Sequence, residues 1–178
     1  MDIREKIVST KEIFNGRIFN VKVHDVVLPD GEAAKREIVT HHGGVGVIAV
    51  TPEREVFMVT QYRIATGDML LEIPAGKLEK NENDTYAAAM RELEEETGYR
   101  TNKLIPLGTY YVSPGYCSEP LTIYLAENLE YVGQHLDDDE FLNLSKIPLD
   151  KLYEMVMNNE IRDCKTAIAI LKAKIILG

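Results

Sequence analysis

The stretch GKLEKNENDTYAAAMRELEEETGY, residues 76–99, joins a glycine-bearing loop to an alanine-rich helix that ends in a run of carboxylates. Glu92, Glu95 and Glu96 stand at positions i, i+3 and i+4, so an α-helix places all three on one face. Like charges on one face repel one another, and the C-terminal end of a helix disfavours negative charge. A bound cation would offset both costs, and hard oxygen ligands suit Mg²⁺ or Mn²⁺. From the spacing alone, a solvated acidic helix end is an equally good interpretation.

The residues that flank this helix favour the metal-binding interpretation. The run LEIPAG, residues 71–76, precedes the helix, and Gly98 and Tyr99 end it. Together with the helix, these residues resemble the Nudix box, which is the signature of the Nudix hydrolases. The second half of that box reads Arg-Glu-hydrophobic-any-Glu-Glu-any-Gly-hydrophobic, and residues 91–99 match it at every position. The motif is long and specific for the superfamily.

The first half of the box departs from the pattern by one residue. Eight residues separate Glu82 from Arg91, where the pattern has seven. We place the extra residue in the polar run 81–84, because a loop and a helix N-cap tolerate an insertion at little cost. The helix glutamates then keep their spacing, whereas the role of Glu82 stays open. Arg91 is expected to be an internal ion-pair partner that orients a glutamate of the box.

The resemblance implies a hydrolase that depends on divalent metal ions. Glu92, Glu95 and Glu96 would hold the ions, and the carbonyl oxygen of Ala75 would supply a further ligand. Ions that bridge protein and phosphates neutralise charge and lower the pKa of a bound water. Glu95 and Glu96 are therefore also candidate catalytic residues, and Gly76 is a candidate for substrate contact.

A second acidic cluster, DDDE, occupies residues 137–140. Taken alone, such a run is expected to be a solvated loop. In Nudix hydrolases, however, a loop after the box carries an additional carboxylate that binds metal or activates water. By that resemblance, Glu140 is the candidate for the extra metal ligand and Asp138 the candidate for the water-activating base. An aspartate at the second position departs from the longer glutamate often found there.

Shorter matches extend the resemblance over nearly the whole chain. The runs FNGRIF (14–19), LPDG (28–31), QYR (61–63) and SPG (113–115) are similar to the ADP-ribose pyrophosphatase branch. This branch implies Mg²⁺-dependent hydrolysis of ADP-ribose to AMP and ribose 5-phosphate. Because the box is common to the superfamily, another nucleotide sugar or a nucleoside triphosphate stays open as the substrate. A non-catalytic nucleotide sensor stays open as well.

The resemblance also suggests which residues recognise the substrate. Arg63 would grip the diphosphate, since a guanidinium offers the fork geometry that phosphate prefers. This branch typically forms homodimers through its N-terminal β-domain, so Arg36 and Glu37 are candidates for a contribution from a partner subunit. Glu119 is a candidate for contact with a ribose hydroxyl. For Arg63, Arg36 and Glu37, a simple surface charge is the alternative.

The fold that the resemblance implies is of the mixed α/β class. It is a Nudix α/β/α sandwich with a mixed β-sheet (residues 44–178), preceded by a small antiparallel β-domain (residues 1–43). Asn15-Gly16 predicts a hairpin, and the apolar run 45–50 predicts a buried strand. The expected strands are residues 7–14, 17–28, 35–41, 45–50, 55–62, 70–74, 104–112 and 121–127. The expected helices are residues 84–97, 149–158 and 162–176.

The composition excludes some classes of protein but does not identify the function. Of the 178 residues, 45% are hydrophobic, which is enough to bury a substantial core. The net charge of −9 argues against a general nucleic-acid binder, which needs a basic face. Cys117 and Cys164 have no metal-ligand spacing and are expected to be reduced thiols. No apolar leader or membrane-length run is present in the sequence, so we expect a cytoplasmic protein without membrane contact.

Overall fold

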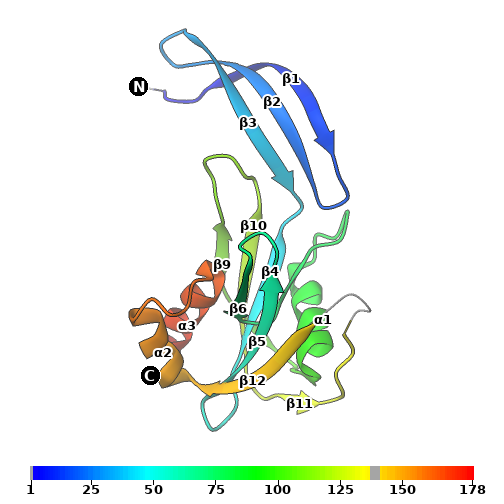
Figure 1. The fold of residues 1–178 in the computed structure, drawn as a ribbon, viewed down its shortest axis with the longest axis vertical. Coiled ribbons are helices and arrows are strands. Elements are labelled where there is room, and N and C mark those ends of the chain that lie inside the picture. The colour runs from blue at the N-terminus through cyan, green and yellow to red at the C-terminus, as the bar shows by residue number, and fades with distance from the viewer. Residues whose placement is uncertain (1, 137–140) are drawn as a thin grey trace. The chain divides into compact units, whose positions relative to one another are not determined.

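The computed structural model describes residues 2–136 and 141–178, which form two compact units (Figure 1). The first unit consists of Met1–Gly43 and Tyr111–Pro120, and the second of Gly44–Tyr110 and Leu121–Gly178. None of the helices in the described part of the chain is long and apolar enough to cross a membrane.

The first unit is built on a three-stranded antiparallel sheet in the order β1-β2-β3 (Figure 1). Its strands are β1 (Lys6–Asn15), β2 (Phe19–Val27) and β3 (Ala33–His41). The predicted hairpin at Asn15-Gly16 is confirmed: Asn15 pairs with Asn20, and the Gly16 amide donates to the Phe19 carbonyl at 3.1 Å. The second turn places Gly31 at a φ of 93°, a left-handed conformation that glycine adopts without strain.

The second unit contains a mixed sheet in the order β7-β4-β10-β9 and an antiparallel sheet in the order β12-β5-β6. The pairing of β4 with β10 is parallel, whereas β4 and β7 run antiparallel. A short antiparallel pair, β8 with β11, completes the strands. The strands are β4 (Gly44–Ala49), β5 (Glu55–Arg63), β6 (Asp68–Glu72), β7 (Ala75–Lys77), β8 (Tyr99–Arg100), β9 (Leu104–Tyr111), β10 (Pro120–Ala126), β11 (Glu130–Tyr131) and β12 (Leu142–Pro148).

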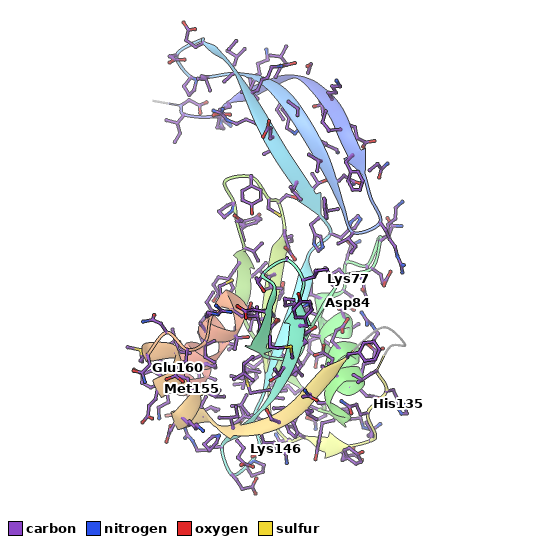
Figure 2. All side chains as sticks on the ribbon, viewed as in Figure 1. Lys77, Asp84, His135, Lys146, Met155 and Glu160 are labelled. Atoms are coloured by element: carbon purple, nitrogen blue, oxygen red, sulfur yellow. The ribbon has the colours of Figure 1, made fainter. Side chains whose placement is uncertain are left out.

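Among the described residues of this unit, three helices cover the strands. They are α1 (Thr85–Thr97), α2 (Leu149–Met157) and α3 (Cys164–Leu177). The Asp84 carboxylate caps α1 by accepting from the amides of Tyr86 and Ala87, both at 3.0 Å (Figure 2). Gly98 ends α1 in the left-handed conformation at a φ of 76°. The helix therefore begins and ends at the residue types that its sequence predicts.

Alternate residues of β4 face two separate hydrophobic cores. Val47 belongs to a cluster with Leu93 of α1, whereas Ile48 belongs to a cluster with Leu152 of α2 and Ile170 of α3. The strands therefore lie between α1 and the pair α2 and α3, as Figure 1 shows. This arrangement is the predicted α/β/α sandwich. It explains why every residue of β4 is buried.

Candidate active site

The carboxylate face of α1 lies against the loop that precedes it. Glu92 and Glu96 are buried, with 6% and 2% of their surface exposed, whereas Glu95 is half-buried. Burying a charged group is costly unless polar partners surround it. The following contacts supply partners for all three carboxylates, so α1 does not end in a simple solvated acidic run.

Gly76 lies directly under the Glu92 carboxylate. A Cβ atom at position 76 would stand 2.0 Å from the Glu92 carboxyl carbon and 2.1 and 2.3 Å from its oxygens. A side chain at position 76 would therefore displace the Glu92 carboxylate, so glycine is the residue that allows this close approach. The strand β7 that carries Gly76 is held in place because it pairs with Val45 of β4.

Glu96 contacts the residue immediately before that glycine. Its Oε2 accepts a hydrogen bond from the Ala75 amide at 3.0 Å. The two buried carboxylates of α1, one turn apart, thus lie against two consecutive residues of β7. Ala75, Gly76, Glu92 and Glu96, which the sequence selected as neighbours, are brought together.

Arg91 forms ion pairs with several carboxylates of the box. Its Nη1 lies 2.8 Å from Glu92 Oε1 and 2.9 Å from Glu95 Oε2, which confirms the expected internal ion pair. Its Nη2 lies 3.8 Å from Glu82 Oε2, and the same Glu82 oxygen accepts from the Glu79 amide at 2.9 Å. Burial alone would lower the pKa of Arg91, but the charges of Glu92 and Glu95 outweigh it and raise that pKa.

The polar run 81–84, in which we placed the extra residue of the box, lies in the loop between β7 and α1. Asn81, in this loop, has a φ of 72°, a conformation that asparagine tolerates better than most residues. The loop takes up the insertion before the helix begins at Thr85. Glu82 consequently still reaches Arg91, although the sequence spacing left its role open.

The donor set suits a divalent cation. Glu92 and Glu95 both direct an oxygen to one positive group, Arg91, and Glu96 lies on the same helix face. Carboxylate oxygens are the ligands that Mg²⁺ and Mn²⁺ prefer. Among residues 2–136 and 141–178, no three His, Cys, Asp or Glu side chains converge into a ready-made metal cluster. Arg91 supplies a positive charge to this arrangement.

Arg63 lies at the end of β5 and pairs with a glutamate that sequence reasoning missed. Its Nε and Nη2 donate to Glu72 Oε1 and Oε2, both at 2.8 Å, in a bidentate pair. Glu72 is only 1% exposed. Burial alone would raise its pKa, but the hydrogen bonds from Arg63 and the charge of Lys165 outweigh burial and lower it. One glutamate inside the otherwise apolar run LLEIPA was the available signal.

Two further candidates, Arg36 and Glu119, belong to the first unit. Arg36 Nη2 lies 2.5 Å from Glu5 Oε1, and its Nη1 donates to the Lys35 carbonyl at 3.0 Å. Glu119 Oε1 lies 3.4 Å from Nδ1 of His41. Each candidate is therefore held within its own unit by a polar contact.

The remaining candidates, Asp138 and Glu140, lie outside the described residues. The segment before them is bound to the last turn of α1. Gln134 Nε2 donates to the Glu96 carbonyl at 2.5 Å, and the His135 amide donates to the Glu95 carbonyl at 3.2 Å. These bonds satisfy helix-end carbonyls that have no partner within the helix. No residue pattern in the sequence indicates this contact.

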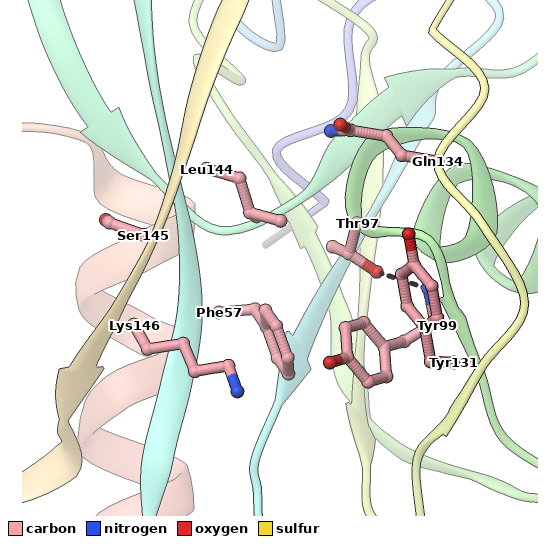
Figure 3. A pocket seen from close by; sticks show the side chains of 8 residues that line it. All are labelled: Phe57, Thr97, Tyr99, Tyr131, Gln134, Leu144, Ser145 and Lys146. Carbon is pink, nitrogen blue, oxygen red and sulfur yellow. Dashed lines mark hydrogen bonds between the residues drawn. The ribbon is translucent and has the colours of Figure 1, made fainter.

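A cavity of about 350 Å³ opens near the end of α1 (Figure 3). Among the described residues, none that is predicted for catalysis or substrate contact lines it. Lys146 lies over the ring of Phe57, 4.9 Å from its centroid, and over that of Tyr99, at 5.8 Å. The lining residues are Phe57, Thr97, Tyr99, Tyr131, Gln134, Leu144, Ser145 and Lys146.

Known proteins resemble this chain over nearly its whole length. Residues 40–165 match the NUDIX domain, and residues 5–39 match the nucleoside diphosphate sugar hydrolase N-terminal domain. The chain is 44% identical to an ADP-ribose pyrophosphatase of Bacillus subtilis (strain 168), over 94% of this chain and 91% of the relative. It is also 44% identical to a methanol dehydrogenase activator of Bacillus methanolicus, over 93% and 90%. A crystal structure of an ADP compounds hydrolase superimposes with a TM-score of 0.85 at 22% identity, covering 99% of this chain and 96% of the other.

Proposed function

The chain belongs to the NUDIX family, and on that premise we propose that it hydrolyses the diphosphate bond of ADP-ribose to AMP and ribose 5-phosphate. The observation that carries the proposal is the packing of Glu92 and Glu96 against Ala75-Gly76, with Arg91 joining Glu92 to Glu95. This is a rigid set of carboxylates built at the residues of the box. The identity of 44% to an ADP-ribose pyrophosphatase supports the substrate.

Glu92, Glu95, Glu96 and the Ala75 carbonyl would hold the divalent ions, and we propose Mg²⁺, with Mn²⁺ as a substitute. When bound, such ions neutralise phosphate charge and lower the pKa of a coordinated water. The residues of the chain fix the geometry. Glu96 is oriented by the Ala75 amide, and Arg91 fixes Glu92 and Glu95 relative to one another.

Arg63 would bind the diphosphate through the edge of its guanidinium that Glu72 does not occupy. Glu72 engages Nε and Nη2, so the edge formed by Nη1 and Nη2 is the one offered to phosphate oxygens. The Arg63 side chain is 40% exposed, which leaves that edge accessible. Gly76 would add a close backbone approach to the substrate.

We further propose Glu140 as an additional metal ligand and Asp138 as the base that activates water. The hydrogen bonds of Gln134 and His135 to α1 support this proposal. The acidic run begins two residues after His135, whose amide is bound to the Glu95 carbonyl. An extended chain spans about 3.3–3.6 Å per residue, so positions 138 and 140 are within reach of the box.

The N-terminal residues 1–43 are proposed to form a homodimer and to contribute Arg36 to a shared substrate site, with residues 44–178 as the hydrolase domain. All ten residues of β1 are exposed, and they include Ile7, Val8, Ile13 and Phe14. An exposed strand at a sheet edge with apolar side chains is a surface that proteins normally cover. Glu119 is proposed to bind a ribose hydroxyl.

Two other functions make different predictions. A NUDIX hydrolase for another nucleotide sugar or a nucleoside triphosphate would use the same carboxylates but prefer a different substrate. A nucleotide sensor would bind tightly without turnover. The retained glutamates and their contacts with Ala75, Gly76 and Arg91 favour an enzyme over a sensor.

A substrate panel tests the proposal. Purified protein with Mg²⁺ would be offered ADP-ribose, other nucleotide sugars and nucleoside triphosphates, with products identified by mass. We expect rapid conversion of ADP-ribose to AMP and ribose 5-phosphate, and a loss of at least about 100-fold in kcat for Glu96→Gln. Preference for a different diphosphate would refute ADP-ribose as the substrate. Near-wild-type turnover by Glu96→Gln would refute the catalytic role of the box glutamates.

A further inference from the structure

Lys165 is a buried lysine in the first turn of α3. It is 9% exposed, although lysines are almost never fully buried without a charged partner. Its Nζ contacts Glu72 Oε2 and lies 3.0 Å from Asp163 Oδ2. Lys165 and Glu72 are 93 residues apart in sequence, so the fold brings them together.

Glu72 is shared between two cations. Arg63 binds both of its oxygens at 2.8 Å, and Lys165 also contacts Oε2. The four formal charges of Arg63, Glu72, Lys165 and Asp163 sum to zero. A buried carboxylate with only one partner could follow that partner as it moves, whereas a carboxylate bound by two cations has a fixed place.

The same turn of α3 also holds the backbone next to Glu72. The Asp163 carboxylate caps α3 by accepting from the Thr166 amide at 3.0 Å and from the Thr166 hydroxyl at 2.5 Å. That hydroxyl oxygen accepts in turn from the Ile73 amide at 2.9 Å, and Thr166 is completely buried. The segment that leads from Glu72 to Gly76 is therefore fixed by α3 just before the box.

We propose that Lys165 is a positioning residue for substrate binding: it holds Glu72 so that the outer edge of the Arg63 guanidinium faces the diphosphate. The proposal rests on the proposed function, in which Arg63 binds phosphate oxygens. Lys165 itself touches neither the substrate nor the metal ions. Without it, Glu72 and Asp163 together carry two negative charges against the single charge of Arg63, so the guanidinium is drawn inward and less of its charge is offered to the substrate.

A substitution of Lys165 tests this role through the split between KM and kcat. We expect Lys165→Met to raise the KM for ADP-ribose about tenfold while kcat changes less than about twofold. Lys165→Arg, which keeps the charge, should raise KM less. Lys172→Met is the matched control, since this lysine of the same helix contacts the Leu107 carbonyl and Tyr110 and is not a partner of Glu72. It should leave KM unchanged.

A double-mutant cycle with Arg63→Ala separates positioning from a general structural effect. If Lys165 acts through Arg63, Lys165→Met should leave KM unchanged in the Arg63→Ala background. An equal increase in both backgrounds, or equal KM values for Lys165→Met and Lys165→Arg, would overturn the proposal. If Lys165→Met shows no cooperative unfolding transition and is therefore not folded, Lys165→Arg takes its place in the double-mutant cycle. Absence of ADP-ribose turnover by the wild type would refute the proposed function instead, independently of any Lys165 variant.

Discussion

At the scale of single residues, the site depends on contacts that leave no room for another atom. Glu92 is buried against Gly76, and Glu96 is bound to the Ala75 amide. Arg91 lies between Glu92 and Glu95 as a counter-charge and so reduces the repulsion between the two carboxylates. Arg91 thus offsets part of the negative charge of the box within the protein.

Gly76→Ala should separate folding from catalysis. The added methyl group would occupy the place of the Glu92 carboxylate, which is the far end of a flexible side chain and can move aside. We expect the melting temperature to change little, whereas kcat falls about 100-fold because a displacement of about 1 Å suffices for such a loss. Circular dichroism and steady-state kinetics measure the two effects.

Gly115→Ala is the matched control for that experiment. A Cβ atom at Gly115 meets no atom of the described residues within 4 Å, and Gly115 has no positive φ. It should retain wild-type kcat. Equal activity of both alanine variants would show that the position of Glu92 does not matter for turnover.

At the scale of elements, α1 could be predicted closely and the network around α3 could not. The start and end of α1 depend on adjacent residues, Asp84 and Gly98, whose capping preferences are local. The pairing of Glu72 with Lys165, 93 residues away, depends on how the elements pack. The strand β7 and the binding of Gln134 to α1 also depend on distant partners. The sequence therefore predicted the carboxylates of the box but not the residues that hold Arg63.

The contact of α3 with β6 should make stability sensitive to acid. The pKa of Glu72 lies below its ordinary value of 4.5, so its ionised form is stabilised in the folded state. This contribution is fully present above the unfolded-state pKa and is lost as the pH falls through the folded-state pKa. The free energy of unfolding, measured with urea, should decrease as the pH is lowered below about 4.5, by at most about 1.4 kcal/mol per pH unit for this one group.

Glu72→Gln tests the origin of this acid sensitivity. The variant should be less stable at neutral pH by roughly 3–5 kcal/mol, because Arg63 and Lys165 lose their buried partner. Its stability should also fall less steeply than that of the wild type below pH 4.5. Glu53→Gln, at an exposed turn position, should keep the wild-type slope. A wild-type slope in Glu72→Gln would assign the acid sensitivity to other carboxylates.

At the scale of the whole molecule, the exposed strand β1 bears on the assembly of the protein. Every residue of β1 is exposed in the single chain, and Val8, Ile13 and Phe14 are 64%, 54% and 52% exposed. Burial of apolar surface stabilises association by about 25 cal/mol per Å² before the costs of association are subtracted. A second copy that covers β1 would remove these side chains from water and pair the free edge of the sheet.

The proposed homodimer predicts a solution mass of about twice 20.1 kDa by light scattering at micromolar concentration. Val8→Glu combined with Phe14→Lys should convert the protein to a monomer, because charges on β1 would have to be buried against a partner. Ile175→Lys is the control, since Ile175 is 83% exposed on α3 and lies in the other unit. It should leave the mass unchanged.

If a partner subunit contributes Arg36 to the substrate site, the monomeric variant should also lose kcat/KM for ADP-ribose while the Ile175 variant keeps it. A wild-type mass of one chain would refute the dimer, and a monomeric variant with full kcat/KM would refute the shared site, because each subunit would then bind its substrate alone.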